Sequence, residues 1–596
     1  MKKNNKNEIY YLIPIILIVT IVPLIVRLRV IPLSGAAYNF WNGETVNYDF
    51  FSYNKMVWII IFTIFAMISF GTKLYKEGYE AIGKTYFYIP MAIYSVAVII
   101  STMVSKYKEI ALGGFVDRYE GMYVLLAYMI ILFVTMNLLK DESHAKTMLY
   151  AIFILLTINC TIGIFQYIGY DLWKTSFGKS LMLPREYKKY ADSLNFNFMK
   201  HEIYSTLYNT NYVGSLMAML VPLSTTMLIL EKNRRLKVIS AIMVILSVVN
   251  LIGSNARSGI VGCTFAFIVL IVMLNRYIIA RWKSFTVITV CIILLVLGIN
   301  TVSKGAVYKR VTSIKTEIIE LVSKTKASRE TADEWPLKSF KVNENIVEMV
   351  INKDTLKIAV REGQINFSDE NNRAINLKFD NNTGKIELLD KRYNGYLIQI
   401  GDFNDQKILQ ISYGILNFTF KLLDNSITLI DNKGNVISLK PVETFGFKGL
   451  EDIGSGRGYI WSRSIPLLKN TLLIGYGPDT FAAYFPQNEF RAKLHYPLWQ
   501  IIDKPHNYYL QTAINTGVIS LIALLVLFSM YFASSAKIYI KNRYDNFNSI
   551  VGLGMFVAVF GYVIAAVFND SIVSVAPVFW VILGMGISVN RMVIKK

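Results

Sequence analysis

Residues 518–532 read Val-Ile-Ser-Leu-Ile-Ala-Leu-Leu-Val-Leu-Phe-Ser-Met-Tyr-Phe, and this apolar run decides the fold class. It carries no charged residue and is long enough to enter the hydrocarbon core of a membrane. Similar runs recur along the 596 residues, of which 54% are hydrophobic and 17% charged. A soluble protein of this length would carry roughly a quarter charged residues. The sequence therefore predicts an all-α polytopic membrane protein.

About twelve transmembrane helices are predicted from these runs. We place them at residues 9–27, 56–72, 86–104, 122–139, 147–167, 212–230, 238–254, 259–275, 284–302, 516–534, 548–568 and 573–590. Lys and Arg gather in the short connections between runs, which is the pattern of cytoplasmic loops. This bias predicts that both termini lie in the cytoplasm. It places four segments outside, namely residues 28–55, 105–121, 168–211 and 303–515.

The net charge of +21 does not indicate a nucleic-acid partner, because the positive residues are spread over these connections rather than gathered in one patch. The three cysteines, Cys160, Cys263 and Cys291, lie in apolar runs and predict neither a disulfide framework nor a metal site. We also find no GxxxxGK[ST] motif with a flanking βαβ unit, so a nucleotide loop is excluded. We expect no metal and no cofactor.

We divide the chain into five parts, of which the long outer segment contributes three. Residues 303–339 include an amphipathic stretch at 312–323 and read as a surface or linker segment. Residues 340–445 alternate apolar and polar side chains, with turn signals at 381–384 and 432–435, and predict an inserted extracytoplasmic β-rich domain. The remaining parts are transmembrane helices at 1–302, an outer loop at 446–515 and transmembrane helices at 516–596.

His506 stands in the segment Asp-Lys-Pro-His-Asn-Tyr-Tyr-Leu-Gln at residues 503–511, directly before the opening apolar run. It is one of four histidines and lies at a predicted membrane surface, with Asn507 beside it. Histidine is the side chain best suited to exchange a proton near neutral pH. His506 is therefore a candidate catalytic base, although a structural role is common for a single interfacial histidine.

Further polar clusters occur at the predicted outer ends of other spans. Arg118 and Glu120 begin one span, and Arg257 stands between two glycines in a tight turn. A guanidinium at the membrane surface requires an anion or a carbonyl group, and its paired donors suit phosphate. These arginines also suit membrane anchoring, and the asparagines suit helix capping. The other candidate residues in these polar clusters are Asn209, Asn211, Arg457 and Tyr476.

In combination, these clusters resemble the O-antigen ligase and polymerase superfamily of bacterial membrane glycosyltransferases, which take glycans from a polyprenyl-diphosphate carrier. The matching pieces occur in the right order: Arg118 to Gly121, Asn209 to Asn211, Gly253 to Gly259, Gly456 to Trp461, Gly475 to Pro478 with Phe481, and His506-Asn507 followed by Gly517. Two positions depart from the family pattern, Ser258 and Ser520, and both are small residues. The insert at about 330–445 has no counterpart that we can place.

The resemblance implies a multi-pass enzyme of the bacterial cytoplasmic membrane with undecaprenyl diphosphate as carrier. Arg257 and Arg457 would bind the diphosphate, His506 would act on the acceptor hydroxyl, and 446–515 would form the catalytic loop. The predicted substrate-binding residues are Arg118, Glu120, Asn209, Asn211, Asn507 and Tyr476. A single displacement, with arginines neutralising the diphosphate without metal, would invert the anomeric centre.

Several alternatives remain open from the sequence. Asp503 and Glu120 are carboxylates that keep a retaining route possible. The acceptor can be a lipid or wall anchor, as for a ligase, the growing glycan, as for a polymerase, or a protein hydroxyl. From another class, a transporter or flippase of lipid-linked glycans also suits twelve spans, although transporters place their polar residues near mid-membrane. The β-rich insert is a candidate for binding the acceptor or a partner.

Overall fold

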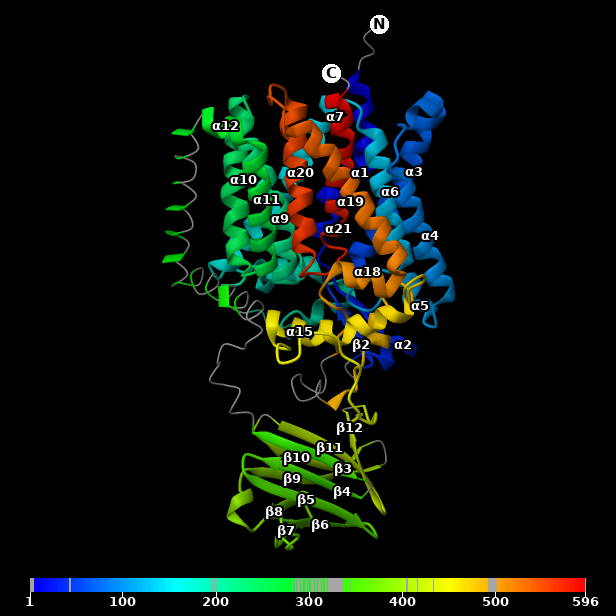
Figure 1. Cartoon of the computed structure of the whole chain (residues 1–596), viewed down its shortest axis with the longest axis vertical. Helices are drawn as coiled ribbons and strands as arrows, with labels where there is room; N and C mark the ends of the chain where they lie inside the picture. The colour runs from blue at the N-terminus through cyan, green and yellow to red at the C-terminus, as the bar shows by residue number, and fades with distance from the viewer. Residues whose placement is uncertain are drawn as a thin grey trace.

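A computed structural model describes residues 5–594, apart from 42–43, 195, 197, 199–200, many positions in 281–320, and 321–335, 344, 404–405, 415, 432 and 491–500. Figure 1 shows a bundle of helices with a β-rich region at one end and both chain termini at the other. Among the described residues, seven helices are long and apolar enough to cross a membrane. The prediction of a helical membrane protein is therefore confirmed, whereas the number of twelve spans stays a prediction.

The long helices follow the predicted runs. They are α3 with the short helix after it (Tyr53–Ala81), α7 (Glu142–Tyr167), α9 (Thr210–Leu230), α10 (Arg234–Gly253), α19 (Val518–Tyr539), α20 (Phe547–Ala565) and α21 (Ala576–Ile594). Four more predicted spans are shorter apolar helices: Glu8–Leu24, which contains α1 (Ile13–Thr20), α4 (Tyr88–Val104), α6 (Met122–Leu138) and α11 (Arg257–Met273). The expected span at 284–302 and the stretch at 312–323 fall largely outside the described residues.

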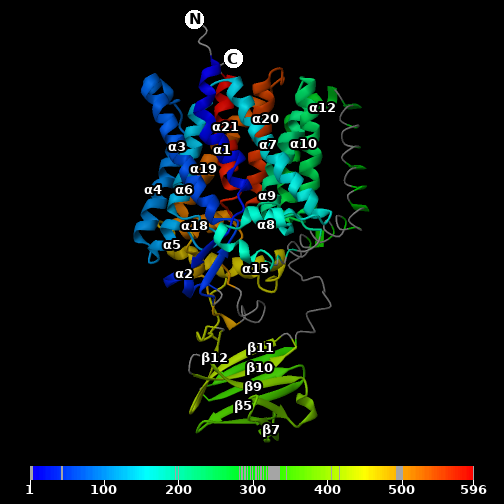
Figure 2. The same cartoon turned by 180° about the vertical axis from the view of Figure 1, so that it is seen from behind.

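Short elements cover the end of the bundle that faces the β-rich region, as the two opposite views show (Figures 1 and 2). Strands β1 (Arg29–Pro32) and β2 (Val46–Asp49) form a small antiparallel sheet there. The helices at this end include α2 (Gly35–Asn39), α5 (Lys108–Gly113), α8 (Ser176–Met182), α15 (Ile453–Ser464), α16 (Phe481–Tyr484) and α18 (Tyr508–Thr516). α12 (Asn275–Ala280) follows α11 at the end of the bundle where the termini lie (Figure 1). The predicted outer segments therefore gather at one end, opposite the termini.

The β-rich region consists of two antiparallel sheets, with strands from Leu337 to Ile430. One sheet contains β3 (Leu337–Asn343), β4 (Ile346–Ile351), β5 (Asp354–Arg361) and β6 (Gln364–Ser368) in chain order. The other contains β7 (Leu377–Asp380), β8 (Lys385–Leu388), β9 (Tyr396–Phe403), β10 (Gln406–Tyr413), β11 (Leu416–Leu423) and β12 (Ser426–Ile430). Alternating buried residues of both sheets form one shared core, as a period of two predicts.

Several contacts join the β-rich region to the helical part, among them the bonds from Nζ of Lys433 to the carbonyl oxygens of Tyr38 and Asn39 in α2. Ser438 pairs with the segment that precedes residue 491. Its N–H donates to the carbonyl oxygen of Asn488 over 2.9 Å, and its carbonyl oxygen accepts from the N–H of Phe490 over 3.1 Å. The ring of Phe490 stacks on Phe340 of β3 with centroids 4.5 Å apart. Because Asn488 and Phe490 lie between α16 and α18, the β-rich region contacts the same segment of chain that leads to His506.

Candidate active site

Small residues let three membrane helices approach closely. A Cβ atom added to Gly259 of α11 would lie 2.6 Å from the carbonyl oxygen of Gly214 in α9. One added to Gly262 of α11 would lie 2.5 Å from the carbonyl oxygen of Gly561 in α20. Contacts between small residues allow such close packing in membranes. They place the N-termini of α9 and α11 beside the C-terminus of α20.

A pocket of about 560 Å³ lies at this junction. Arg257, the first residue of α11, lines it together with Arg457 of α15 and Asn211 of α9. Its other walls are mostly apolar and include Val261, Phe265, Phe447, Trp461, Ile564, Val567 and Phe568. Two guanidinium groups beside an apolar wall suit a ligand that has both an anionic group and a hydrocarbon chain.

A left-handed turn positions Arg457. Gly454, Ser455 and Gly456 have φ angles of 66°, 61° and 88°, a conformation that glycine adopts readily and serine only under strain. The turn returns the carbonyl of Gly454 to Arg457, whose Nη1 donates to it over 2.7 Å. Its Nε donates to the carbonyl oxygen of Phe568 over 3.1 Å. The two bonds fix the guanidinium group at the wall of the pocket.

His506 pairs with Asp570, a residue of the connection between α20 and α21. The imidazole Nδ1 lies 2.8 Å from Oδ2 of Asp570, whose side chain is 1% exposed, whereas the side chain of His506 is 39% exposed. Burial raises the pKa of Asp570, but the charge and hydrogen bond of His506, with Lys504 and Arg118, lower it to about 2. An ionised carboxylate that accepts a hydrogen bond from Nδ1–H favours the neutral tautomer in which Nε2 has no proton and carries a free lone pair. The pair can therefore accept a proton at Nε2.

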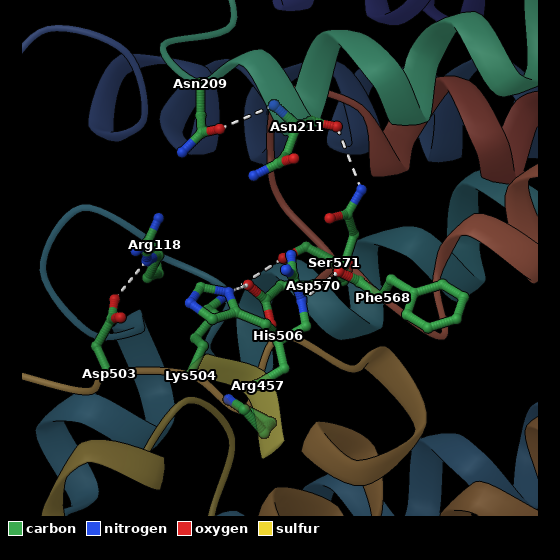
Figure 3. A network of polar contacts seen from close by, with 12 residues as sticks. Arg118, Asn209, Asn211, Arg457, Asp503, Lys504, His506, Phe568, Asp570 and Ser571 are labelled. Atoms are coloured by element: carbon green, nitrogen blue, oxygen red, sulfur yellow. Dashed lines mark hydrogen bonds and ion pairs between the residues drawn. The ribbon is translucent and has the colours of Figure 1, made fainter. Parts of the chain in front are cut away.

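Two hydrogen bonds tie this pair to the pocket. The indole Nε1 of Trp461, in the pocket wall, donates to the carbonyl oxygen of Pro505 over 2.8 Å, next to the histidine. The bond from Arg457 to Phe568 holds the chain two residues before Asp570. Figure 3 shows how these side chains gather from separate segments of the chain. A proton acceptor and an anion pocket therefore share one region.

Arg118 is engaged in an ion pair beside the histidine. Its Nε lies 2.5 Å from Oδ2 of Asp503, and its Nη1 donates to the hydroxyl of Tyr212 over 2.6 Å. Burial raises the pKa of Asp503, but the charge and hydrogen bond of Arg118, together with the charges of His506 and Lys504, lower it overall. Because Asp503 is three residues before His506, Arg118 holds the segment that carries the histidine (Figure 3).

Glu120 belongs to a buried ion cluster. Its carboxylate lies 3.3 Å from Nζ of Lys504 and accepts hydrogen bonds from the hydroxyls of Tyr128 and Ser571 over 2.9 and 2.8 Å. The same Nζ lies 3.9 Å from Asp479, and the side chain of Lys504 is 0% exposed. Burial raises the pKa of Glu120 even with this cation beside it. The contacts of Glu120 in this structure therefore join loops of the protein.

The other predicted binding residues have different surroundings. The side chains of Asn209 and Asn507 accept backbone N–H groups at the starts of α9 and α18, as helix caps do. The ring of Tyr476 stacks on that of Tyr484 with centroids 3.7 Å apart. Asn211, by contrast, lines the pocket. The structure thus brings Arg257, Arg457 and Asn211 together at the pocket, and the binding roles stay predictions.

The motifs assign no role to four residues of this region, namely Asp479, Lys504, Asn569 and Asp570. Asn569 donates to the hydroxyls of Ser215 in α9 and Ser258 in α11 over 2.7 and 2.6 Å, and so joins the two helices. A signal for it existed, because residues 569–571 (Asn-Asp-Ser) are a polar interruption between two apolar spans. Within the part of the chain that the structure describes, no group of three or more His, Cys, Asp or Glu is placed to hold a metal ion.

Comparison with known families gives a match over part of the chain. Residues 408–525 match the family model described as O-antigen ligase. The match begins within β10, includes α15 with Arg457, and ends in α19 after His506. No curated protein and no solved structure matches the chain. The resemblance seen in the motifs is thus confirmed over residues 408–525, which are similar to the O-antigen ligase family.

Proposed function

We propose that the protein transfers a glycan from a polyprenyl-diphosphate carrier to an acceptor hydroxyl, as an O-antigen ligase does. The observation that carries this proposal is the pocket lined by Arg257 and Arg457 next to the pair of His506 and Asp570. The guanidinium groups suit the diphosphate, and the apolar wall of Val261, Phe265 and Ile564 suits the start of the prenyl chain.

In the proposed reaction, Nε2 of His506 removes the proton of the acceptor hydroxyl. The acceptor oxygen then forms a bond to the anomeric carbon, and the bond from that carbon to the diphosphate oxygen breaks with its electron pair. The arginines stabilise the negative charge that develops on the leaving diphosphate. Asp570 stabilises the imidazolium that forms. Proton, bond and charge are balanced without any covalent intermediate.

Two contacts favour a single displacement with inversion over a retaining route. Glu120 is buried against Lys504, and Asp503 is paired with Arg118, so both carboxylates are engaged by cations of the protein. A nucleophilic carboxylate has to reach the anomeric carbon. We place the reaction at the outer face of the bacterial cytoplasmic membrane, with both termini in the cytoplasm, in agreement with the Lys and Arg bias.

The product distinguishes the acceptors that the family permits. The name of the matched family favours a ligase, which attaches the finished glycan to an anchored acceptor. A polymerase would lengthen the glycan on its carrier, and a protein transferase would leave it on a serine or threonine. In a deletion strain, loss of attachment with accumulation of lipid-linked glycan is expected. Loss of long chains alone would indicate a polymerase instead.

Replacing either pocket arginine by lysine should weaken binding of the lipid-linked donor. Lysine retains the charge but not the paired donors, so we expect the KM for the donor to rise about 10- to 100-fold in Arg257→Lys and Arg457→Lys. Donor consumption by purified protein in lipid vesicles measures this. Arg235→Lys, at an exposed position at the other end of α10, is the matched control. An unchanged donor KM in both pocket variants would refute the assignment.

Asp570→Asn should lower the turnover rate while leaving donor binding in place. An amide can donate to Nδ1 and thereby favours the tautomer that carries the proton on Nε2, so we expect kcat to fall about 100-fold. The comparison is with Asp192→Asn, an exposed carboxylate away from the histidine. If donor KM rises and kcat does not change, the residue serves the pocket and does not orient the histidine.

A further inference from the structure

The small strand β2 directs polar side chains inward. Asn47 and Asp49 are 7% and 4% exposed, whereas Tyr48 between them is 60% exposed. The inward face of a strand is normally apolar, because burying a polar group is costly unless it is hydrogen-bonded. One of the two is explained by local structure: Asp49 accepts the N–H groups of Ser52 and Tyr53 at the start of α3. Asn47 has no such capping role.

Asn47 faces the loop that carries Arg118. Its Nδ2 donates to Oδ1 of Asp117 over 3.1 Å. Asp117 and Tyr119 both have left-handed backbones, with φ of 66° and 54°. Burial, followed by the charge of Asp49, raises the pKa of Asp117 to about 6. Two carboxylates and one amide therefore lie close together on this side of the loop.

Two buried polar atoms at this place have no hydrogen-bond partner among the residues that the structure describes. They are Oδ1 of Asn47 and the hydroxyl oxygen of Tyr119, a residue that is 6% exposed. The ring of Tyr119 packs edge-on against that of Tyr53, whose N–H donates to Asp49, with centroids 5.4 Å apart. Burial, and then the charges of Asp49 and Asp117, raise the pKa of the phenol group. Buried donors and acceptors of native proteins are nearly always satisfied. Unsatisfied atoms beside carboxylates indicate a place for a polar ligand.

An exposed aromatic ring borders the same place. Tyr208 is 42% exposed, has a left-handed φ of 77°, and packs on Phe51 with ring centroids 5.4 Å apart. Burial, and next the charge of Asp117, raise the pKa of its phenol group. A ring that presents an apolar face and a polar tip, next to hydrogen-bond acceptors, suits the faces and hydroxyls of a sugar.

An ion pair joins the loop of Asp117 to the segment that carries the histidine. Asp117 precedes Arg118, whose guanidinium pairs with Asp503, three residues before His506. Tyr208 precedes Asn209, the cap of α9, and Arg118 donates to the hydroxyl of Tyr212 in the same helix over 2.6 Å. The arginine pocket has two guanidinium groups and suits the diphosphate donor better than this place, where two carboxylates lie beside Arg118.

We propose that Asn47, Asp117, Tyr119 and Tyr208 form a subsite that holds an unphosphorylated sugar residue of the acceptor and presents its hydroxyl to His506. The proposal rests on the proposed function. It specifies the acceptor as a glycan, free or on an anchor, rather than a protein hydroxyl. In this subsite the carboxylate of Asp117 accepts sugar hydroxyls, and the ring of Tyr208 stacks on the sugar.

The test separates acceptor binding from donor binding. Purified protein in vesicles receives lipid-linked glycan from a deletion strain, and the acceptor probe is the oligosaccharide released from the surface glycan of the same organism. We expect Tyr208→Leu and Asp117→Asn to raise the acceptor KM about tenfold or more, with donor KM within about twofold of wild type. More of the donor should also be lost to water. Tyr170→Leu, at a tyrosine that is 73% exposed elsewhere, is the matched control.

Each outcome of this experiment supports or contradicts one specific claim. An unchanged acceptor KM in both variants overturns the subsite, and so does an equal rise of donor and acceptor KM. If Asp117→Asn does not fold, as judged by gel filtration, the half-exposed Tyr208 variant decides alone. A wild-type protein that transfers nothing refutes the proposed function instead, because the subsite is then never reached. Transfer to a peptide with no transfer to the oligosaccharide probe overturns the choice of a glycan acceptor.

Discussion

Replacing His506 by alanine should reduce glycan transfer about 10²- to 10⁴-fold, the range that a positioned general base contributes. The reason is that Nε2 of this residue is the proton acceptor in the proposed reaction, and Asp570 holds its ring by a contact of 2.8 Å. The side chain is 39% exposed, so its removal leaves no large cavity in a core. Transfer should therefore fall with little loss of folded protein.

The measurement is the size distribution of surface glycan in a deletion strain complemented at matched expression, together with the turnover rate of the purified variant. His201→Ala is the matched control, because that histidine is exposed and its ring contacts the carbonyl of Tyr167 away from the pocket. Full restoration of the glycan by His506→Ala would show that the catalytic assignment is wrong.

The second large effect concerns stability rather than chemistry. Lys504→Met should destabilise the fold by about 3–5 kcal/mol, the usual consequence of removing one partner of a buried ion pair. Nζ lies 3.3 Å from Glu120 and 3.9 Å from Asp479, and it donates to the carbonyl oxygen of Ser571 over 3.0 Å. Without the lysine, two buried carboxylates face each other with no cation between them.

Thermal unfolding in detergent and the yield of folded protein measure this effect. Lys541→Met, at an exposed lysine after α19, should change stability by no more than about 0.5 kcal/mol. Adding Glu120→Gln to Lys504→Met should recover part of the loss, because it removes one of the uncompensated charges. A Lys504→Met protein as stable as wild type would mean that the cluster does not hold the loops together.

Local patterns in the sequence were enough to predict the elements. Apolar runs marked eleven of the helices, and period-two alternation marked strands such as β5 and β12. The turn predicted at 381–384 lies between β7 and β8. Each of these signals depends on neighbouring residues, through helix length, strand period and turn chemistry. The close packing of α11 on α9 at Gly259, by contrast, became visible only in the structure.

The partners of the site residues could not be predicted in this way. His506 and Asp570 are separated by 64 positions, and Arg118 and Asp503 by 385. Which carboxylate meets which cation depends on how the helices pack, and the sequence of one element does not contain that information. Lys504 illustrates the consequence, because it reads as an interfacial lysine and is in fact fully buried.

The central claim is that the glycan leaves its carrier in this protein, and one measurement tests it directly. Purified protein is placed in lipid vesicles with lipid-linked glycan from the deletion strain, and released polyprenyl diphosphate and transferred glycan are counted together. The account predicts equal amounts of the two products with wild type and almost none with His506→Ala. Movement of intact lipid-linked glycan across the bilayer without release of polyprenyl diphosphate would contradict it and indicate a transporter.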